Sequence, residues 1–151
     1  MARIKAFRFE WTDAWHHIGE GYDTILETSE SGRVSILFLV NGRPFQLDLT
    51  DIEDSFIADM KLLKKWNKRY YDNDGVLDGT MWRLYLTYDD TVIAATGMNG
   101  FPANFLAFLD ILHQRYGVPK AALEDEKWIK QCIKDTKILE APDDDPMAMY
   151  L

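Results

Sequence analysis

The chain has 151 residues, a formal net charge of −8 and one cysteine, Cys132. This length fits one domain, and a single cysteine excludes both an intramolecular disulfide and a cysteine-rich metal knuckle. The negative charge argues against direct nucleic-acid binding over a broad surface, because phosphates would be repelled. Residues 1–11 contain no apolar core segment and no run approaches 18 apolar residues, so we predict a cytoplasmic protein without a signal peptide or membrane span.

Alternating apolar residues predict four strands in the first third of the chain, at residues 3–11, 22–28, 34–40 and 45–49. The third of these is almost wholly apolar, which is typical of a central strand covered on both faces. Asn41-Gly42 is a strong hairpin signal, because both residues tolerate positive φ. We therefore predict that residues 22–49 form a three-stranded antiparallel meander.

A helix is predicted next, from Thr50 to about Tyr71. Thr50 and Glu53 have the spacing of a capping box, in which each side chain satisfies a free amide at the helix start. Apolar residues then follow helical spacing at Phe56, Met60, Leu63 and Tyr70. The basic run at residues 61–69 falls in the later turns, where cations complement the helix macrodipole. Asp72-Asn73-Asp74-Gly75 ends the helix and does not match the spacing of a calcium loop.

Residues 79–116 form the clearest unit of the sequence. Alternation over residues 81–88 predicts a strand, Asp89-Asp90 a tight break, and residues 92–96 a second strand of an antiparallel hairpin. Pro102 suits the first position of a helix, which Gly117 and Pro119 end. The apolar residues of that helix repeat at helical spacing: Phe105, Phe108, Leu109, Leu112 and Tyr116.

The same unit carries a sequence pattern, D-G-x-x-W-x-L, then Y-D-D, then G-x-N-x-x-P-x-N-F-x-x-F-L. Its residues here are Asp78, Gly79, Trp82, Leu84, Tyr88, Asp89, Asp90, Gly97, Asn99, Pro102, Asn104, Phe105, Phe108 and Leu109. The pattern resembles the closing hairpin and helix of small, uncharacterised bacterial α+β proteins, over about a quarter of the chain. These positions are turn formers and core residues, so the resemblance implies a fold and no activity.

A further helix is predicted at residues 121–139, and Pro142 and Pro146 cannot continue it. We therefore expect one α+β domain over residues 1–139, followed by an acidic, mobile tail at residues 140–151. Strands clustered before helices favour a mainly antiparallel sheet of five or six strands, with two or three helices packed on one face.

One cluster could bind a metal. His16, His17 and Glu20 would give zinc three ligands and an open coordination position, which would fit a small metal-dependent hydrolase. Adjacent histidines point apart in a strand and lie about 100° apart on a helix, so His17 does not easily join the other two. The alternative is a polar loop beside an aromatic core. Because no other catalytic motif occurs, we expect no cofactor.

The functional prediction is a non-enzymatic module that binds another protein. It rests on the missing catalytic spacing, the acidic balance and a surplus of aromatic residues, and the candidate contacts are Trp11, Trp15, Trp66, Tyr70 and Tyr71. The alternative is an acidic inhibitor or nucleic-acid mimic acting on a nucleic-acid-binding protein, in a phage or mobile-element defence context. Its acidic surface would include Asp143, Asp144 and Asp145.

Overall fold

The computed structural model describes residues 3–13, 21–28, 32–66, 68–72, 80–120 and 126–140. Within them, eight strands form one sheet: β1 (Ile4–Asp13), β2 (Tyr22–Thr28), β3 (Val34–Val40), β4 (Arg43–Asp48), β5 (Lys68–Asp72), β6 (Thr80–Tyr88), β7 (Thr91–Met98) and β8 (Thr136–Glu140). The strand order is β4-β3-β2-β1-β6-β7-β5-β8. The helices are α1 (Glu53–Asp59), the 3-10 helix η1 (Met60–Leu63), α2 (Phe105–Tyr116) and α3 (Glu126–Asp135).

The predicted α+β class is confirmed, but the sheet is larger than predicted and is partly parallel. The sheet has eight strands in place of five or six, and β5 pairs with β7 in parallel while the other neighbours are antiparallel. The two additional strands are β5 and β8, which pair with each other at one edge of the sheet. Both come from segments that the helical spacing had assigned to helices.

Turn chemistry identified the two hairpins correctly. Asn41 and Gly42 have φ of 52° and 78° and join β3 to β4, with Val40 opposite Arg43. Asp89, with φ of 49°, lies in the turn between β6 and β7, and Tyr88 pairs with Thr91. The predicted meander of β2, β3 and β4 is therefore present, and β4 forms one edge of the sheet.

The predicted helix from Thr50 to Tyr71 and its capping box are wrong. The helical segment ends with η1 at Leu63, and residues 68–72 form β5. Thr50 Oγ1 accepts a hydrogen bond from the Val34 amide at 3.1 Å, and Glu53 Oε2 accepts one from the Ile4 amide at 3.1 Å. Both side chains thus satisfy amides of neighbouring strands, and no side chain caps α1.

The predicted C-terminal helix is also too long. α3 ends at Asp135, and the chain continues directly into β8; residues 121–125 and 141–151 lie outside the described residues. The Thr136 hydroxyl donates to the Cys132 carbonyl at 2.6 Å and accepts from the Phe101 amide at 3.0 Å. This exchange of partners marks the change from helix to strand, and the strand continues to Glu140. α2 likewise begins later than Pro102 suggested, at Phe105, whose amide donates to the Pro102 carbonyl.

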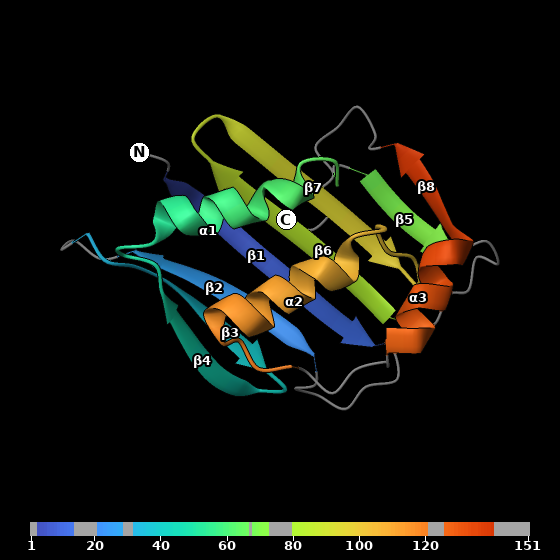
Figure 1. The fold of residues 1–151 in the computed structure, drawn as a ribbon, viewed down its shortest axis with the longest axis horizontal. Helices are drawn as coiled ribbons and strands as arrows, with labels where there is room; N and C mark the ends of the chain where they lie inside the picture. Colours follow the sequence, from blue (N-terminus) through green and yellow to red (C-terminus); the bar gives the residue numbers. More distant parts are fainter. Residues whose placement is uncertain are drawn as a thin grey trace.

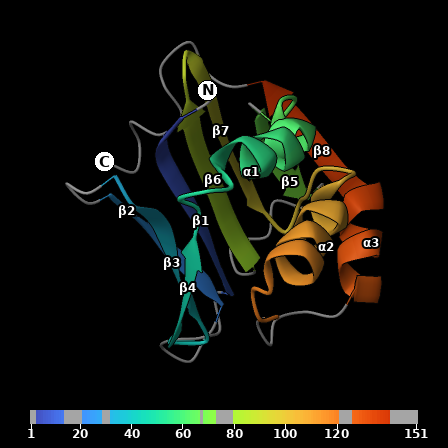
Figure 2. The ribbon, with the colours of Figure 1, turned by 60° about the vertical axis from the view of Figure 1, so that its left-hand side comes forward.

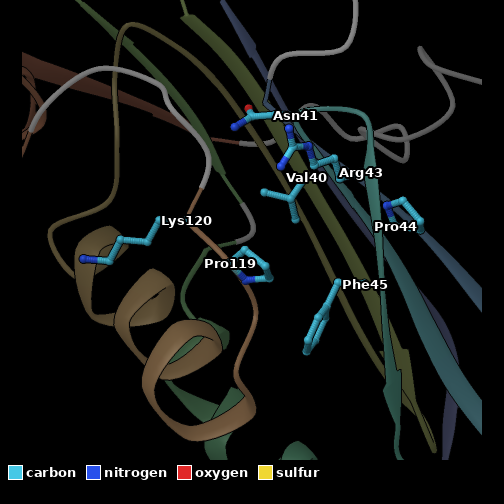
Figure 3. A pocket seen from close by; sticks show the side chains of 7 residues that line it. All are labelled: Val40, Asn41, Arg43, Pro44, Phe45, Pro119 and Lys120. Atoms are coloured by element: carbon cyan, nitrogen blue, oxygen red, sulfur yellow. The ribbon is translucent and has the colours of Figure 1, made fainter.

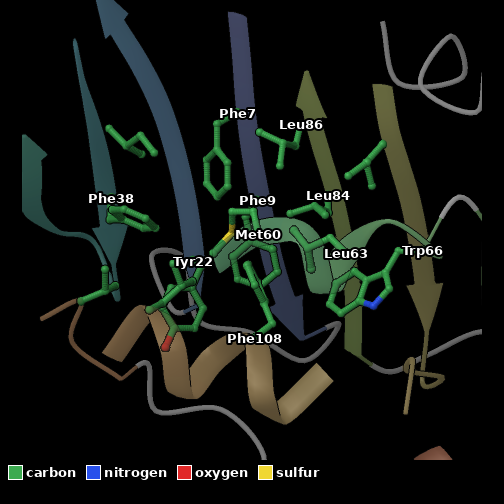
Figure 4. Close-up of a cluster of buried hydrophobic side chains, with 14 of the residues drawn as sticks. Phe7, Phe9, Tyr22, Phe38, Met60, Leu63, Trp66, Leu84, Leu86 and Phe108 are labelled. Carbon is green, nitrogen blue, oxygen red and sulfur yellow. The ribbon is translucent and has the colours of Figure 1, made fainter. Parts of the chain in front are cut away.

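The helices lie on one side of the sheet, and the hydrophobic core fills the space between them. α1 and α2 cross one face, while α3 lies at the end of the sheet that carries β8 (Figures 1 and 2). Figure 4 shows aromatic and aliphatic side chains from the strands meeting those of α2 and η1. The largest fully buried side chains include Phe9, Phe38, Phe56, Trp66, Trp82, Phe101, Phe105 and Phe108.

Asp59 joins α1 to α2 at the surface of this layer. Its carboxylate accepts a hydrogen bond from Arg115 Nη1 at 2.8 Å and another from the Tyr116 hydroxyl. Burial, followed by the hydrogen bond to Asp59, raises the pKa of Tyr116 to about 12. The two helices are therefore held together by polar groups as well as by the packing of Phe56 on the Tyr116 ring.

Candidate functional site

Three of the five predicted contact residues belong to the core. Trp66, Tyr70 and Trp11 expose only 1%, 3% and 3% of their surface. The Trp66 ring stacks on Phe105, with centroids 5.7 Å apart and planes 17° apart. Because the chain leaves the helix at Leu63, this ring turns into the core, so these three residues are not available to a partner. Trp15 and the side chain of Tyr71 lie outside the described part of the structure.

The basic run at residues 61–69 does not form one helical face either. Its residues are divided among η1, the turn after it and β5, with Lys64 and Lys65 exposed in the turn. A site for single-stranded nucleic acid would combine such cations with stacking aromatics. Of the aromatic residues interleaved here, Trp66 and Tyr70 are buried, so the described side chains do not present this combination at the surface; the side chain of Tyr71 is not among them.

The structure does not describe the predicted metal ligands or the predicted acidic surface residues. His16, His17, Glu20 and Asp143–Asp145 lie outside the described residues. Among the residues that are described, no group of three His, Cys, Asp or Glu side chains could hold a metal ion. In the same part of the chain, no helix is long and apolar enough to cross a membrane.

The remaining histidine, His113, and the single cysteine, Cys132, lie at positions that the fold itself explains. His113 Nδ1 lies 2.9 Å from the Val118 carbonyl oxygen, just beyond the end of α2, where Gly117 adopts a left-handed φ of 74°. Cys132 is partly buried on α3 and packs against the core. Neither residue lies in a catalytic arrangement with other described side chains, and their positions are explained by the helix end and the core.

A different surface emerges on the side of the sheet that faces away from the helices. We call it the outer face, and define it by side chains that alternate with core residues on β1, β3, β6 and β7: Arg8, Glu10, Leu37, Leu39, Met81, Arg83, Tyr85, Val92 and Met98. Among the described elements, no helix covers it (Figure 2). An antiparallel sheet with one open face usually places polar residues there, whereas this face carries both charged and apolar side chains.

An ion-pair cluster occupies the middle of the outer face. Glu10 accepts hydrogen bonds from both Arg8 and Arg83, and its side chain is only 15% exposed. Glu10 stands opposite Arg83 in the register of β1 and β6, and Arg8 stands opposite Tyr85. Two guanidinium groups thus share the Glu10 carboxylate. Arg8 is half-exposed and keeps N–H donors directed to solvent or to a partner.

Apolar side chains flank this cluster. Met81 and Val92 are 43% and 52% exposed, and they lie at opposite ends of the β6–β7 hairpin. Leu37, Leu39 and Met98 are half-buried. Arg, Tyr and Met are among the residue types enriched in protein–protein interfaces. This face could have been predicted from the sequence, because the residues that alternate with the core residues of β6 are Met81, Arg83, Tyr85 and Thr87.

A second feature is a cavity of about 580 Å³ on the helical side, which we call the hairpin pocket. It lies between the β3–β4 hairpin and the segment that follows α2 (Figure 3). Its lining residues are Val40, Asn41, Arg43, Pro44, Phe45, Pro119 and Lys120. Sequence reasoning missed it, because the two walls are far apart in the chain and each reads locally as a turn.

The chain matches no protein-family model, and comparisons with curated proteins and with solved structures also give no match. The resemblance of residues 78–109 to a bacterial family therefore stays a prediction.

Proposed function

We propose that this protein is a non-enzymatic interaction module that binds another protein through its outer face. The observation that carries this proposal is the Arg8–Glu10–Arg83 cluster, flanked by the exposed side chains of Met81 and Val92. Scattered exposed apolar residues are ordinary on a soluble protein. Their position around a partly desolvated arginine cluster is the arrangement that protein interfaces use for anchoring residues.

The partner should present a carboxylate next to apolar side chains. Arg8 is half-exposed, and arginine binds carboxylates through two parallel hydrogen bonds. The chain as a whole carries −8, so a carboxylate of the partner is attracted to Arg8 and repelled by the net charge of the chain. Such a distribution fixes the orientation of the complex more than it increases its affinity.

Two pairs of matched variants test which face binds. Arg8→Glu and Val92→Lys alter the outer face, while Lys64→Glu and Ile52→Lys make comparable changes at exposed positions outside it. Each variant is used as bait in a native lysate, after circular dichroism has shown an unchanged fold. We expect wild-type protein and the two control variants to retain the same partner, and both outer-face variants to lose it.

Two results would overturn the proposal. One is a partner retained by Arg8→Glu and Val92→Lys but lost by Lys64→Glu or Ile52→Lys, which would move the interface to the helical side. The other is light scattering that shows a dimer dissociated by Val92→Lys, which would make the occupant a second copy of this chain. Turnover of a substrate by the purified protein would contradict the non-enzymatic part.

A further inference from the structure

We propose that the hairpin pocket binds a small organic monoanion, an aromatic or aliphatic carboxylate of about the size of phenylbutyrate. Its volume of about 580 Å³ falls within the range of about 300–1,000 Å³ that is usual for small-molecule sites. The pocket is formed by residues that the outer face does not use, so this proposal is independent of the proposed function.

The charge of the pocket points to an anion. Arg43 lies on one wall and Lys120 on the other, and none of the seven described lining residues is acidic (Figure 3). Neither cation forms an ion pair with another described residue. The whole chain has 25 acidic and 17 basic residues, so two cations with no carboxylate among the described lining residues run against its average. A carboxylate beside Arg43 would gain charge-assisted hydrogen bonds, and Lys120 adds positive charge on the opposite wall.

The remaining lining residues point to an apolar body attached to that carboxylate. Val40 is buried, and Phe45 is partly buried and packs against the core. In Figure 3 the side chains of Val40 and Phe45 extend from the hairpin towards Pro119 on the opposite wall. An aromatic ring and two aliphatic surfaces favour a hydrocarbon group over a sugar or a phosphate, because pockets for apolar ligands are lined by such side chains.

Hydrogen bonds hold both walls of the pocket in place. On the hairpin side, the Asn41 amide donates to the Gly21 carbonyl at 2.9 Å, and the Gly21 amide donates to Asn41 Oδ1 at 3.0 Å. On the other side, the Tyr22 hydroxyl donates to the Pro119 carbonyl at 3.3 Å. The start of β2 therefore anchors both walls. A preformed pocket loses little conformational freedom on binding, which favours affinity for a small ligand.

The experiment is an NMR titration of the full chain, labelled with ¹⁵N, with 4-phenylbutyrate and with its neutral analogue 4-phenylbutanamide. We expect saturable shifts at the amides of Val40, Gly42, Gly117 and Lys120 with the carboxylate, and binding about tenfold weaker with the neutral amide. Arg43→Gln should weaken carboxylate binding about tenfold, since it removes charge-assisted hydrogen bonds, and Lys120→Gln should weaken it less, since it removes only nearby positive charge. Lys64→Gln, an exposed lysine outside the pocket, should leave it unchanged.

Three results would overturn this inference: no saturable shift, equal affinity for the carboxylate and the amide, or equal binding by wild type and both pocket variants. Saturable shifts confined to Met81 and Val92 would also overturn it, because they would place the ligand on the outer face. The outer-face variant Val92→Lys serves as a further control and should bind the carboxylate normally. Loss of the protein partner in that variant would leave the pocket result unaffected.

Discussion

The indole N–H of Trp66 donates a hydrogen bond of 2.6 Å to the side-chain Oδ1 of Asn104. The same amide group donates through Nδ2 to the Leu62 carbonyl at 2.9 Å. Asn104 thus connects the end of η1 and a buried core ring to the start of α2, although its side chain does not cap that helix. A buried indole N–H needs such a partner, because leaving it unsatisfied costs more than the bond itself contributes.

Replacing this side chain should therefore destabilise the fold. Asn104→Ala removes both hydrogen bonds and leaves the Trp66 N–H and the Leu62 carbonyl without partners, so we expect a loss of about 2–4 kcal/mol in the free energy of unfolding. Urea denaturation followed by tryptophan fluorescence measures it. Gln114→Ala, an exposed change on the same helix, is the control and should change stability by less than about 0.5 kcal/mol. Equal losses in the two variants would contradict this role of Asn104.

Gly97 is required by the close approach of Trp82. A Cβ atom at this position would lie 2.5 Å from the Gly100 carbonyl oxygen, and closer still to Trp82 Nε1. Those two groups form a hydrogen bond of 2.8 Å across the glycine. Gly97→Ala should therefore cost about 3 kcal/mol, because a packed core must shift to admit the methyl group.

Gly32→Ala separates this steric effect from backbone strain. Gly32 has φ of +87°, and a methyl group added there would meet no atom within 4 Å, so the substitution should cost only about 1–2 kcal/mol through its left-handed backbone. Thermal unfolding of the two variants compares them directly. A Gly97→Ala protein as stable as wild type would show that Trp82 does not pack against this glycine.

Asp48 should titrate at unusually low pH. Hydrogen bonds from the Thr50 hydroxyl and the Thr50 amide, and then one from Arg33, lower its pKa from 3.8 to about 2. Since the folded-state pKa is depressed, the stabilising contribution is present above pH 3.8 and is lost as the pH falls towards about 2. Thr50→Ala should raise this pKa more than Arg33→Gln does. NMR titration of the Asp48 carboxyl carbon measures this pKa in both variants. A larger increase of the pKa in Arg33→Gln than in Thr50→Ala would contradict the greater effect of Thr50.

Local chemistry predicted the turns and the best helix. Asn41-Gly42 could accept positive φ at both positions, and Gly117 could end α2 in the left-handed conformation, so neither feature depended on distant contacts. The segment Lys68–Asp72 was different. Its residues, Lys-Arg-Tyr-Tyr-Asp, fit the end of a basic helix as well as a strand, and pairing with β7 and β8 decided the outcome.

The candidate site, too, depended on contacts between distant parts of the chain, which the sequence pattern does not show. The sequence marked Trp66 as a surface aromatic because a continuous helix would have placed it beside lysines, whereas the turn after Leu63 directs it into the core. The two faces of β6 could be separated by alternation, but which face the helices cover depends on where α1 and α2 cross the sheet (Figure 1). That placement is a property of the tertiary structure.

The central claim is that the outer face binds a protein partner, and site-specific photo-crosslinking tests it most directly. A benzophenone amino acid is introduced at Val92 on the outer face, or at Ile52 outside it; both are exposed apolar positions, at 52% and 37%. Irradiation in native lysate should attach a second, different protein at Val92 and none at Ile52, and adding Arg8→Glu to the Val92 probe should abolish the product. A product at Ile52 alone, or a Val92 product that survives Arg8→Glu, would contradict the account.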